Sequence, residues 1–330
     1  MDKKTYKQIF NILIAILITF IISIIIGLGI GLGFKKTSEP FSQTPPTINK
    51  DTLVKYTELI SWIYSDLGGN NLTNIPERFT RLDGDERWAL FQDNLTPGHC
   101  TLLHRATYDT NEILTDLYSQ FTVSQNKNGI YVNPEFWKSY TQEIQLQQNN
   151  ALQKYISNGT CTSLDLVGHS LGGATVAMAA VDNGSKLLKG KINNIITFGN
   201  PRPFSTTQDP WWWLWWGKDR SQTCNNFNNL ARGNVLRFAH IKSSNHDDGD
   251  PVPALPLSWD HCAKQSVLLY SEDPQGQQNV SIDTNAGLDI PNDRVYTSID
   301  DFASWLTTFV TDQPSWHNIT GYRSIIEKTF

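Results

Sequence analysis

Ser163-Leu164-Asp165-Leu166-Val167-Gly168-His169-Ser170-Leu171-Gly172-Gly173 is the most informative stretch of this 330-residue chain. Its first five residues have the pattern of a short buried strand, and the small residues of 173–180 favour a helix. Between them lies a G-x-S-x-G motif. A strand, a sharp turn and a helix are what a nucleophile elbow requires, because the strained turn lifts the serine oxygen clear of the sheet. We therefore expect Ser170 to be a catalytic nucleophile.

Further segments alternate between helix and strand patterns. Apolar spacing predicts helices over 53–63 and 134–157, and apolar runs predict strands over 101–107, 192–199 and 234–241. Strands that alternate with helices imply a mainly parallel sheet covered on both faces. The sequence thus predicts an α/β fold of the α/β-hydrolase type, with a mainly parallel central sheet and helices on both faces.

A long apolar segment precedes this body. No charged residue occurs from Gln8 to Phe34, a length that can span about 30 Å of hydrocarbon as a helix. A cleavable signal peptide has a shorter apolar core and a small-residue cleavage site, which is not evident here. We expect one N-terminal transmembrane helix within a signal anchor at 1–36, a polar linker at 37–50 and the hydrolase domain at 51–330.

Charges around the apolar segment predict its orientation. Three lysines precede it and two follow it, so we expect a single-pass membrane protein with a cytoplasmic N-terminus and a translocated, lumenal or extracellular body. Overlapping G-x-x-x-G pairs would let two anchors pack as a weak homodimer, through Gly27, Gly29, Gly31 and Gly33. The net charge of −5, with no basic block beyond the N-terminus, argues against a nucleic-acid partner.

A serine nucleophile needs a base and an acid that orients the base. In α/β-hydrolases the acid and then the histidine follow the serine along the chain. Asp250 is our candidate acid, because it follows the last predicted strand and opens a proline-rich loop; Asp247 and Asp248 are close alternatives. Chain order leaves His261 and His317 as candidates for the base.

Five motifs occur in an order that is more specific than the elbow alone. They are L-H-R-A-T at 103–107, G-H-S-L-G-G at 168–173, T-F-G-N-P-R at 197–202, D-P-V-P-A-L-P at 250–256 and W-H-N-I-T-G-Y at 316–322. In these motifs the chain resembles the class 3 lipases, the family of the fungal triacylglycerol lipases, from about Leu53 to its end. The resemblance implies a serine lipase that hydrolyses acylglycerols or phospholipids without a metal or organic cofactor.

The resemblance also assigns the remaining catalytic groups. In the family the catalytic histidine lies near the chain end before a tyrosine, as His317 does before Tyr322, and the earlier histidine is typically not catalytic. The oxyanion hole would combine the backbone N–H of Leu171 with a donor on Thr107. Ala106 departs from the glycine of the family, so we expect a slightly altered hole or one that forms on substrate binding.

Five of the eleven tryptophans lie in one six-residue run. They are Trp211, Trp212, Trp213, Trp215 and Trp216. Tryptophan favours the membrane–water interface, because its ring is apolar while its N–H needs a wet partner. We expect a loop that docks the catalytic face on lipid; a buried aromatic cluster is the alternative. The identity of the lid stays open between this loop and a short segment after Thr107.

The even number of cysteines agrees with an exported domain. Cys100 and Cys161 precede strands that are parallel neighbours in the family fold, so their pairing is sterically plausible and leaves Cys224 with Cys262. Six N-x-S/T sequons give weaker support, at Asn71, Asn94, Asn158, Asn183, Asn279 and Asn318. A glycan on Asn318 would crowd the active site, so we expect Asn318 to be unmodified.

Two other functions remain open beside a membrane-anchored lipase. An esterase for soluble short-chain esters would show no gain of activity at a lipid interface. A catalytically silent, lipase-like binding protein would keep the fold and show no reaction that depends on Ser170.

Overall fold

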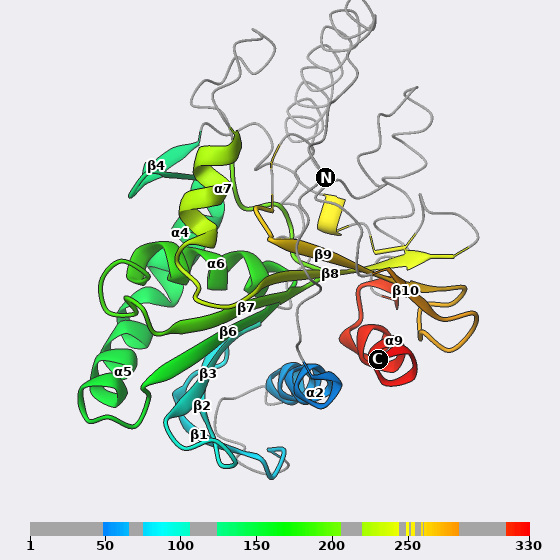
Figure 1. Cartoon of the computed structure of the whole chain (residues 1–330), viewed down its shortest axis with the longest axis horizontal. Helices are drawn as coiled ribbons and strands as arrows, with labels where there is room; N and C mark the ends of the chain where they lie inside the picture. The colour runs from blue at the N-terminus through cyan, green and yellow to red at the C-terminus, as the bar shows by residue number, and fades with distance from the viewer. Residues whose placement is uncertain are drawn as a thin grey trace, which may run out of the picture. The chain divides into compact units, whose positions relative to one another are not determined.

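An eight-stranded sheet forms the centre of the domain (Figure 1). In spatial order its strands are β1 (Phe79–Gly84), β2 (Trp88–Asp93), β3 (His99–His104), β6 (Ser163–His169), β7 (Ile192–Phe198), β8 (Val235–Lys242), β9 (Gln265–Ser271) and β10 (Ser281–Asp283). The strands from β3 to β9 run parallel, and the outer pairings are antiparallel. The prediction of an α/β fold with a mainly parallel central sheet is confirmed.

Helices lie on both faces of this sheet (Figure 1). One face carries α4 (Pro134–Glu143), α5 (Gln145–Ser157), α6 (Leu171–Asn183) and α7 (Arg220–Asn228); the other carries α2 (Lys50–Ser65) and α9 (Ile319–Thr329). Successive strand residues point to opposite faces, so Leu166 packs in the first core and Val167 in the second. The described residues also include a small hairpin of β4 (Gln125–Lys127) and β5 (Ile130–Val132) and the short 3-10 helix η2 (Val252–Ala254).

The computed structural model describes residues 49–65, 75–105, 124–205, 220–243, 249–250, 252–254, 259, 261–283 and 315–330. Several predictions therefore fall outside the described residues: the membrane anchor and nearly all of the linker, Ala106 and Thr107, the tryptophan run, and the alternative acids Asp247 and Asp248. Within the described ranges, no helix is long and apolar enough to cross a membrane.

The single helix expected over 134–157 is interrupted at one residue. Ile144 has φ −124° and ψ −45°, outside helical values, although its N–H still bonds the Tyr140 carbonyl at 3.1 Å. The N–H of Gln148 in turn bonds the Ile144 carbonyl at 3.1 Å. The prediction of one continuous helix is wrong at this position, because the torsion angles of Ile144 divide the segment into α4 and α5.

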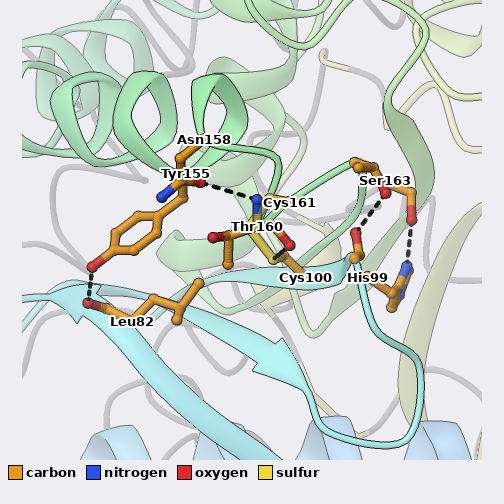
Figure 2. The surroundings of a disulfide bond; sticks show 10 residues. Leu82, His99, Cys100, Tyr155, Asn158, Thr160, Cys161 and Ser163 are labelled. Atoms are coloured by element: carbon orange, nitrogen blue, oxygen red, sulfur yellow. Dashed lines mark hydrogen bonds between the residues drawn. A yellow bond between two sulfur atoms is a disulfide. The ribbon is translucent and has the colours of Figure 1, made fainter.

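Both disulfides join the cysteines that the predicted fold brings together. Cys100–Cys161 links β3 to the segment before β6, and Figure 2 shows Tyr155 beside it, with its hydroxyl donating to the Leu82 carbonyl. Cys224–Cys262 links α7 to the segment before β9. The structure describes all four cysteines and leaves none of them free.

His104 is a buried imidazole that ties β3 to two helices. Its Nδ1 lies 3.0 Å from Oγ1 of Thr175 on α6, and its Nε2 bonds the side chain of Gln148 on α5. Burial lowers the pKa of His104 to about 4. Between this value and the ordinary histidine pKa near 6.5, the unfolded chain therefore binds a proton that the folded chain does not.

We expect the contribution of His104 to stability to be complete above about pH 6.5 and to decline as pH falls toward 4. The loss amounts to at most about 3 kcal/mol for this residue. Urea unfolding across this pH interval measures it, with His104→Gln as the comparison. The variant should show a shallower loss of unfolding free energy with acid; an unchanged pH dependence would contradict the assignment.

Candidate active site

Ser170 occupies a strained turn between a strand and a helix, as the motif predicts. It follows the last residue of β6 and caps α6, with φ +57° and ψ −136°. Its N–H donates to the Phe198 carbonyl on the adjacent strand β7 at 3.0 Å. A Cβ on Gly172 would lie only 2.5 Å from the His104 carbonyl oxygen, so a glycine is required for α6 to begin this close to β3.

Asp250 and His317 form a buried hydrogen bond. Nδ1 of His317 lies 2.7 Å from Oδ2 of Asp250, whose side chain is fully buried. The backbone N–H of Asp250 donates to the His240 carbonyl on β8 at 2.8 Å, which fixes the acid beside that strand. His317 lies two residues before α9, whose N-cap is Asn318. The acid and the histidine are separated by 67 positions and meet only in the folded chain.

His261, the other candidate base, has different partners. Its Nε2 donates to the Pro253 carbonyl at 2.8 Å, and its Nδ1 lies 3.3 Å from the side-chain amide of Asn200. Arg237 donates to the same Pro253 carbonyl at 3.2 Å. His261 therefore supports the loop that follows Asp250.

Two more donors hold the Asp250 carboxylate. The Tyr322 hydroxyl donates to Oδ2, and the Val252 N–H donates to Oδ1 at 3.0 Å. The Tyr322 oxygen also accepts the His240 N–H at 3.3 Å. Burial and then the Asp250 charge raise the pKa of Tyr322 well above its usual value, so the phenol keeps its proton as a donor. The sequence marks Tyr322 only as the tyrosine after His317, and this role as a donor was missed.

The second ring nitrogen of His317, Nε2, is buried and has no hydrogen-bond partner among the described residues, so no bond joins it to Ser170 Oγ. The ring nevertheless lies at the elbow, because the His169 ring stacks on it with centroids 4.7 Å apart. Catalytic hydrogen bonds are often long without substrate and tighten when it binds. An unpaired Nε2 is the atom that a general base needs.

Leu171 is the first residue of α6, so the helix offers its N–H no partner. A helix N-terminus also favours negative charge, which suits an oxyanion beside Ser170. The second expected donor, Thr107, lies beyond Arg105, where that described range ends.

The described sequons differ in accessibility. Four of them are exposed, at Asn94, Asn158, Asn279 and Asn318. Asn183 is buried, and its Nδ2 donates to the Tyr140 hydroxyl and to Asn149. Oδ1 of Asn318 accepts the Thr320 N–H at 3.0 Å, so this side chain caps α9 beside His317. An unmodified Asn318 stays a prediction.

The family model of the class 3 lipases matches residues 101–212, a segment that contains β3 and the Ser170 elbow. This match agrees with the resemblance to the class 3 lipases that the motifs predict. A comparison with curated proteins finds no match.

Solved fungal lipases share the fold at low sequence identity. A deletion mutant of the Rhizomucor miehei lipase propeptide complex has a TM-score of 0.53 and 16% identity, over 82% of this chain and 92% of that chain. The native complex has a TM-score of 0.51 and 17% identity, with 82% and 88% covered. Nonglycosylated LIP2 lipase of Yarrowia lipolytica has a TM-score of 0.51 and 16% identity, with 79% and 93% covered. Family and fold together support a carboxylic ester hydrolase.

Gly199, directly after β7, lies where the site leaves no room for a side chain. It has φ +56°, and a Cβ there would lie 2.7 Å from Asp250 Oδ2 and 3.0 Å from His317 Cε1. Gly199→Ala should displace the acid and the histidine and lower ester hydrolysis by about 100-fold or more. Initial rates and thermal melting of the purified variants measure this effect.

Gly159→Ala is the matched control. Gly159 also has a positive φ, of +78°, but no heavy atom lies within 4 Å of its Cβ position. Alanine there carries a similar backbone strain, on the order of 1 kcal/mol, without touching the site. Equal activity of the two variants would contradict the proposed crowding at Gly199.

Proposed function

We propose that this chain is a membrane-anchored serine lipase that hydrolyses carboxylic ester bonds of acylglycerols or phospholipids. The observation that carries the proposal is the 2.7 Å hydrogen bond between His317 Nδ1 and the buried Asp250. It lies beside a serine that the backbone holds in a strained elbow. The class 3 lipase match over the elbow segment and the likeness to fungal lipases support the same chemistry.

In the proposed acylation step, Asp250 holds the Nδ1–H of His317, which leaves Nε2 to accept the Ser170 proton. Ser170 Oγ then attacks the ester carbonyl carbon, and the N–H of Leu171 and a donor on Thr107 stabilise the oxyanion. When the tetrahedral intermediate collapses, the ester C–O bond breaks and protonated His317 gives its proton to the leaving alcohol.

Deacylation repeats these steps with water as the nucleophile. His317 takes a proton from water, the hydroxide attacks the acyl carbon, and the proton returns to Ser170 as the fatty acid leaves. The cycle requires no metal or organic cofactor.

Two segments outside the described residues support the proposal that the enzyme acts on substrate in a lipid surface. The apolar segment of 8–34 would anchor the domain at a bilayer, which raises its effective concentration on lipid. The tryptophan run would dock the catalytic face. Both disulfides fit a domain translocated to an oxidising compartment, with the N-terminus on the cytoplasmic side.

Fatty-acid release by the full chain in mild detergent tests the proposal, with triolein emulsion, phosphatidylcholine vesicles and monomeric p-nitrophenyl butyrate as substrates. We expect hydrolysis of emulsion or vesicles, and a loss on the order of 10³-fold or more in Ser170→Ala. Ser163→Ala is the matched control, because Ser163 begins β6, at the end of the strand opposite to Ser170, where its Oγ bonds Nδ1 of His99 at 2.9 Å. This control should keep its activity.

Other outcomes would replace the proposal. Turnover of the butyrate ester alone would make the protein an esterase for soluble esters. No turnover of any substrate by a folded protein would favour the silent binding protein.

A further inference from the structure

A second histidine, His169 of the elbow, packs against His317. The two rings are stacked, with centroids 4.7 Å apart and an interplanar angle of 27°. Nε2 of His169 lies 3.0 Å from the His317 carbonyl oxygen, and its Nδ1 lies 2.8 Å from the hydroxyl of Tyr64, near the end of α2. The proposed reaction steps use neither Tyr64 nor His169.

These partners fix the tautomer of His169. A carbonyl oxygen can only accept, so Nε2 carries the proton and donates to His317. Nδ1 therefore has the lone pair, and the Tyr64 hydroxyl is its donor. Burial and then the nearby His317 lower the pKa of His169 well below its usual value. His169 thus stays neutral when its neighbour takes up the serine proton.

We propose that Tyr64 and His169 are positioning residues that set the orientation of His317, an inference that rests on the lipase function proposed above. The stacked His169 ring fixes the plane of the His317 imidazole, and its Nε2–H holds the His317 main chain. Asp250 fixes Nδ1 of the same ring. Tyr64 acts through His169: its hydroxyl donates to Nδ1 and, together with the His317 carbonyl at Nε2, holds the His169 ring in one orientation.

Loss of the Tyr64 hydroxyl would leave Nδ1 of His169 without a donor in a buried site. The His169 ring would then be held by its Nε2–H bond and its ring stacking alone, and it could turn. A turned ring would lose the stacked contact that fixes the plane of the His317 imidazole. His317 would move, and a misplacement of about 1 Å at a catalytic group costs roughly 100-fold in rate.

Helix α2, which carries Tyr64, is held in place by its contacts with α9. It packs against α9, which begins just after His317, through apolar side chains that include Ile60 and Ile319. An ion pair between Glu58 and Arg323 joins the two helices at 3.0 Å. Tyr64 also lies under Arg105, whose guanidinium carbon is 5.9 Å from the ring centroid and which directly precedes the expected oxyanion segment. One helix therefore contacts both α9 and Arg105.

Tyr64→Phe in the full chain tests the proposal, because it keeps the ring and removes only the hydroxyl. We expect kcat to fall about 10- to 100-fold with little change in KM, and a fluorophosphonate to label Ser170 more slowly by a similar factor. Tyr155→Phe is the matched control: its hydroxyl donates to the Leu82 carbonyl at 2.7 Å and accepts from Lys154 Nζ at 3.2 Å, far along the chain from His317. That variant should keep both rates.

Nitrogen NMR of histidine-labelled protein gives a readout that is independent of activity. We expect the Nε2–H tautomer of His169 in the wild type and, in Tyr64→Phe, an Nδ1 resonance shifted by the loss of the hydrogen bond that it accepts. If wild-type Ser170 proves unreactive, the proposed function fails, and the spectra still decide whether Tyr64 controls His169.

Three results would overturn the inference: unchanged kcat and labelling in Tyr64→Phe, an equal loss in Tyr155→Phe, or an Nδ1–H tautomer of His169 in the wild type.

Discussion

The close approach of strand β6 and helix α6 at Ser170 is the constraint on which the site depends. Only a tight turn with a positive φ joins the two elements, and that turn projects the serine at the carboxyl end of the sheet. Because β6, β7 and β8 are parallel neighbours, the residues that follow them meet at one edge. Ser170, Gly199 and Asp250 follow these three strands.

A buried carboxylate is the second constraint, because a charge removed from water must be fully hydrogen bonded. Among the described residues, three groups bond Asp250, and two of them, His317 and Tyr322, come from the C-terminal segment around α9. The segment around the last described helix therefore supplies the base and also holds the carboxylate of the acid in place. Helix α2 in turn packs on α9, so the first and last described helices stabilise the site together.

The features that depend on short stretches of sequence could be predicted from the sequence. The elbow, the parallel strands and the candidate acid follow from short motifs and apolar runs in the chain. The interruption at Ile144 could not be predicted, since the apolar spacing continues across it. The partnership of Tyr64 with His169 was missed for a related reason: the residues lie 105 positions apart, and neither has a distinctive local pattern.

Resemblance and structure contribute different parts of the account of His317. The residues alone left two histidines open, and the family motif favoured the later one. The structure adds a physical reason, because His317 bonds Asp250 while His261 bonds the loop that follows it. The hydrogen bond from Tyr322 to the Asp250 carboxylate could not be predicted from the motif, because nothing in the sequence around Tyr322 indicates its partner.

Mass spectrometry of the full chain after treatment with a long-chain fluorophosphonate tests the central claim most directly. The account predicts one covalent adduct, on the peptide that contains Ser170, and a labelling rate that falls by on the order of 10³-fold or more in Asp250→Asn. No adduct on the folded protein, an adduct on another serine, or labelling unaffected by Asp250→Asn would contradict it.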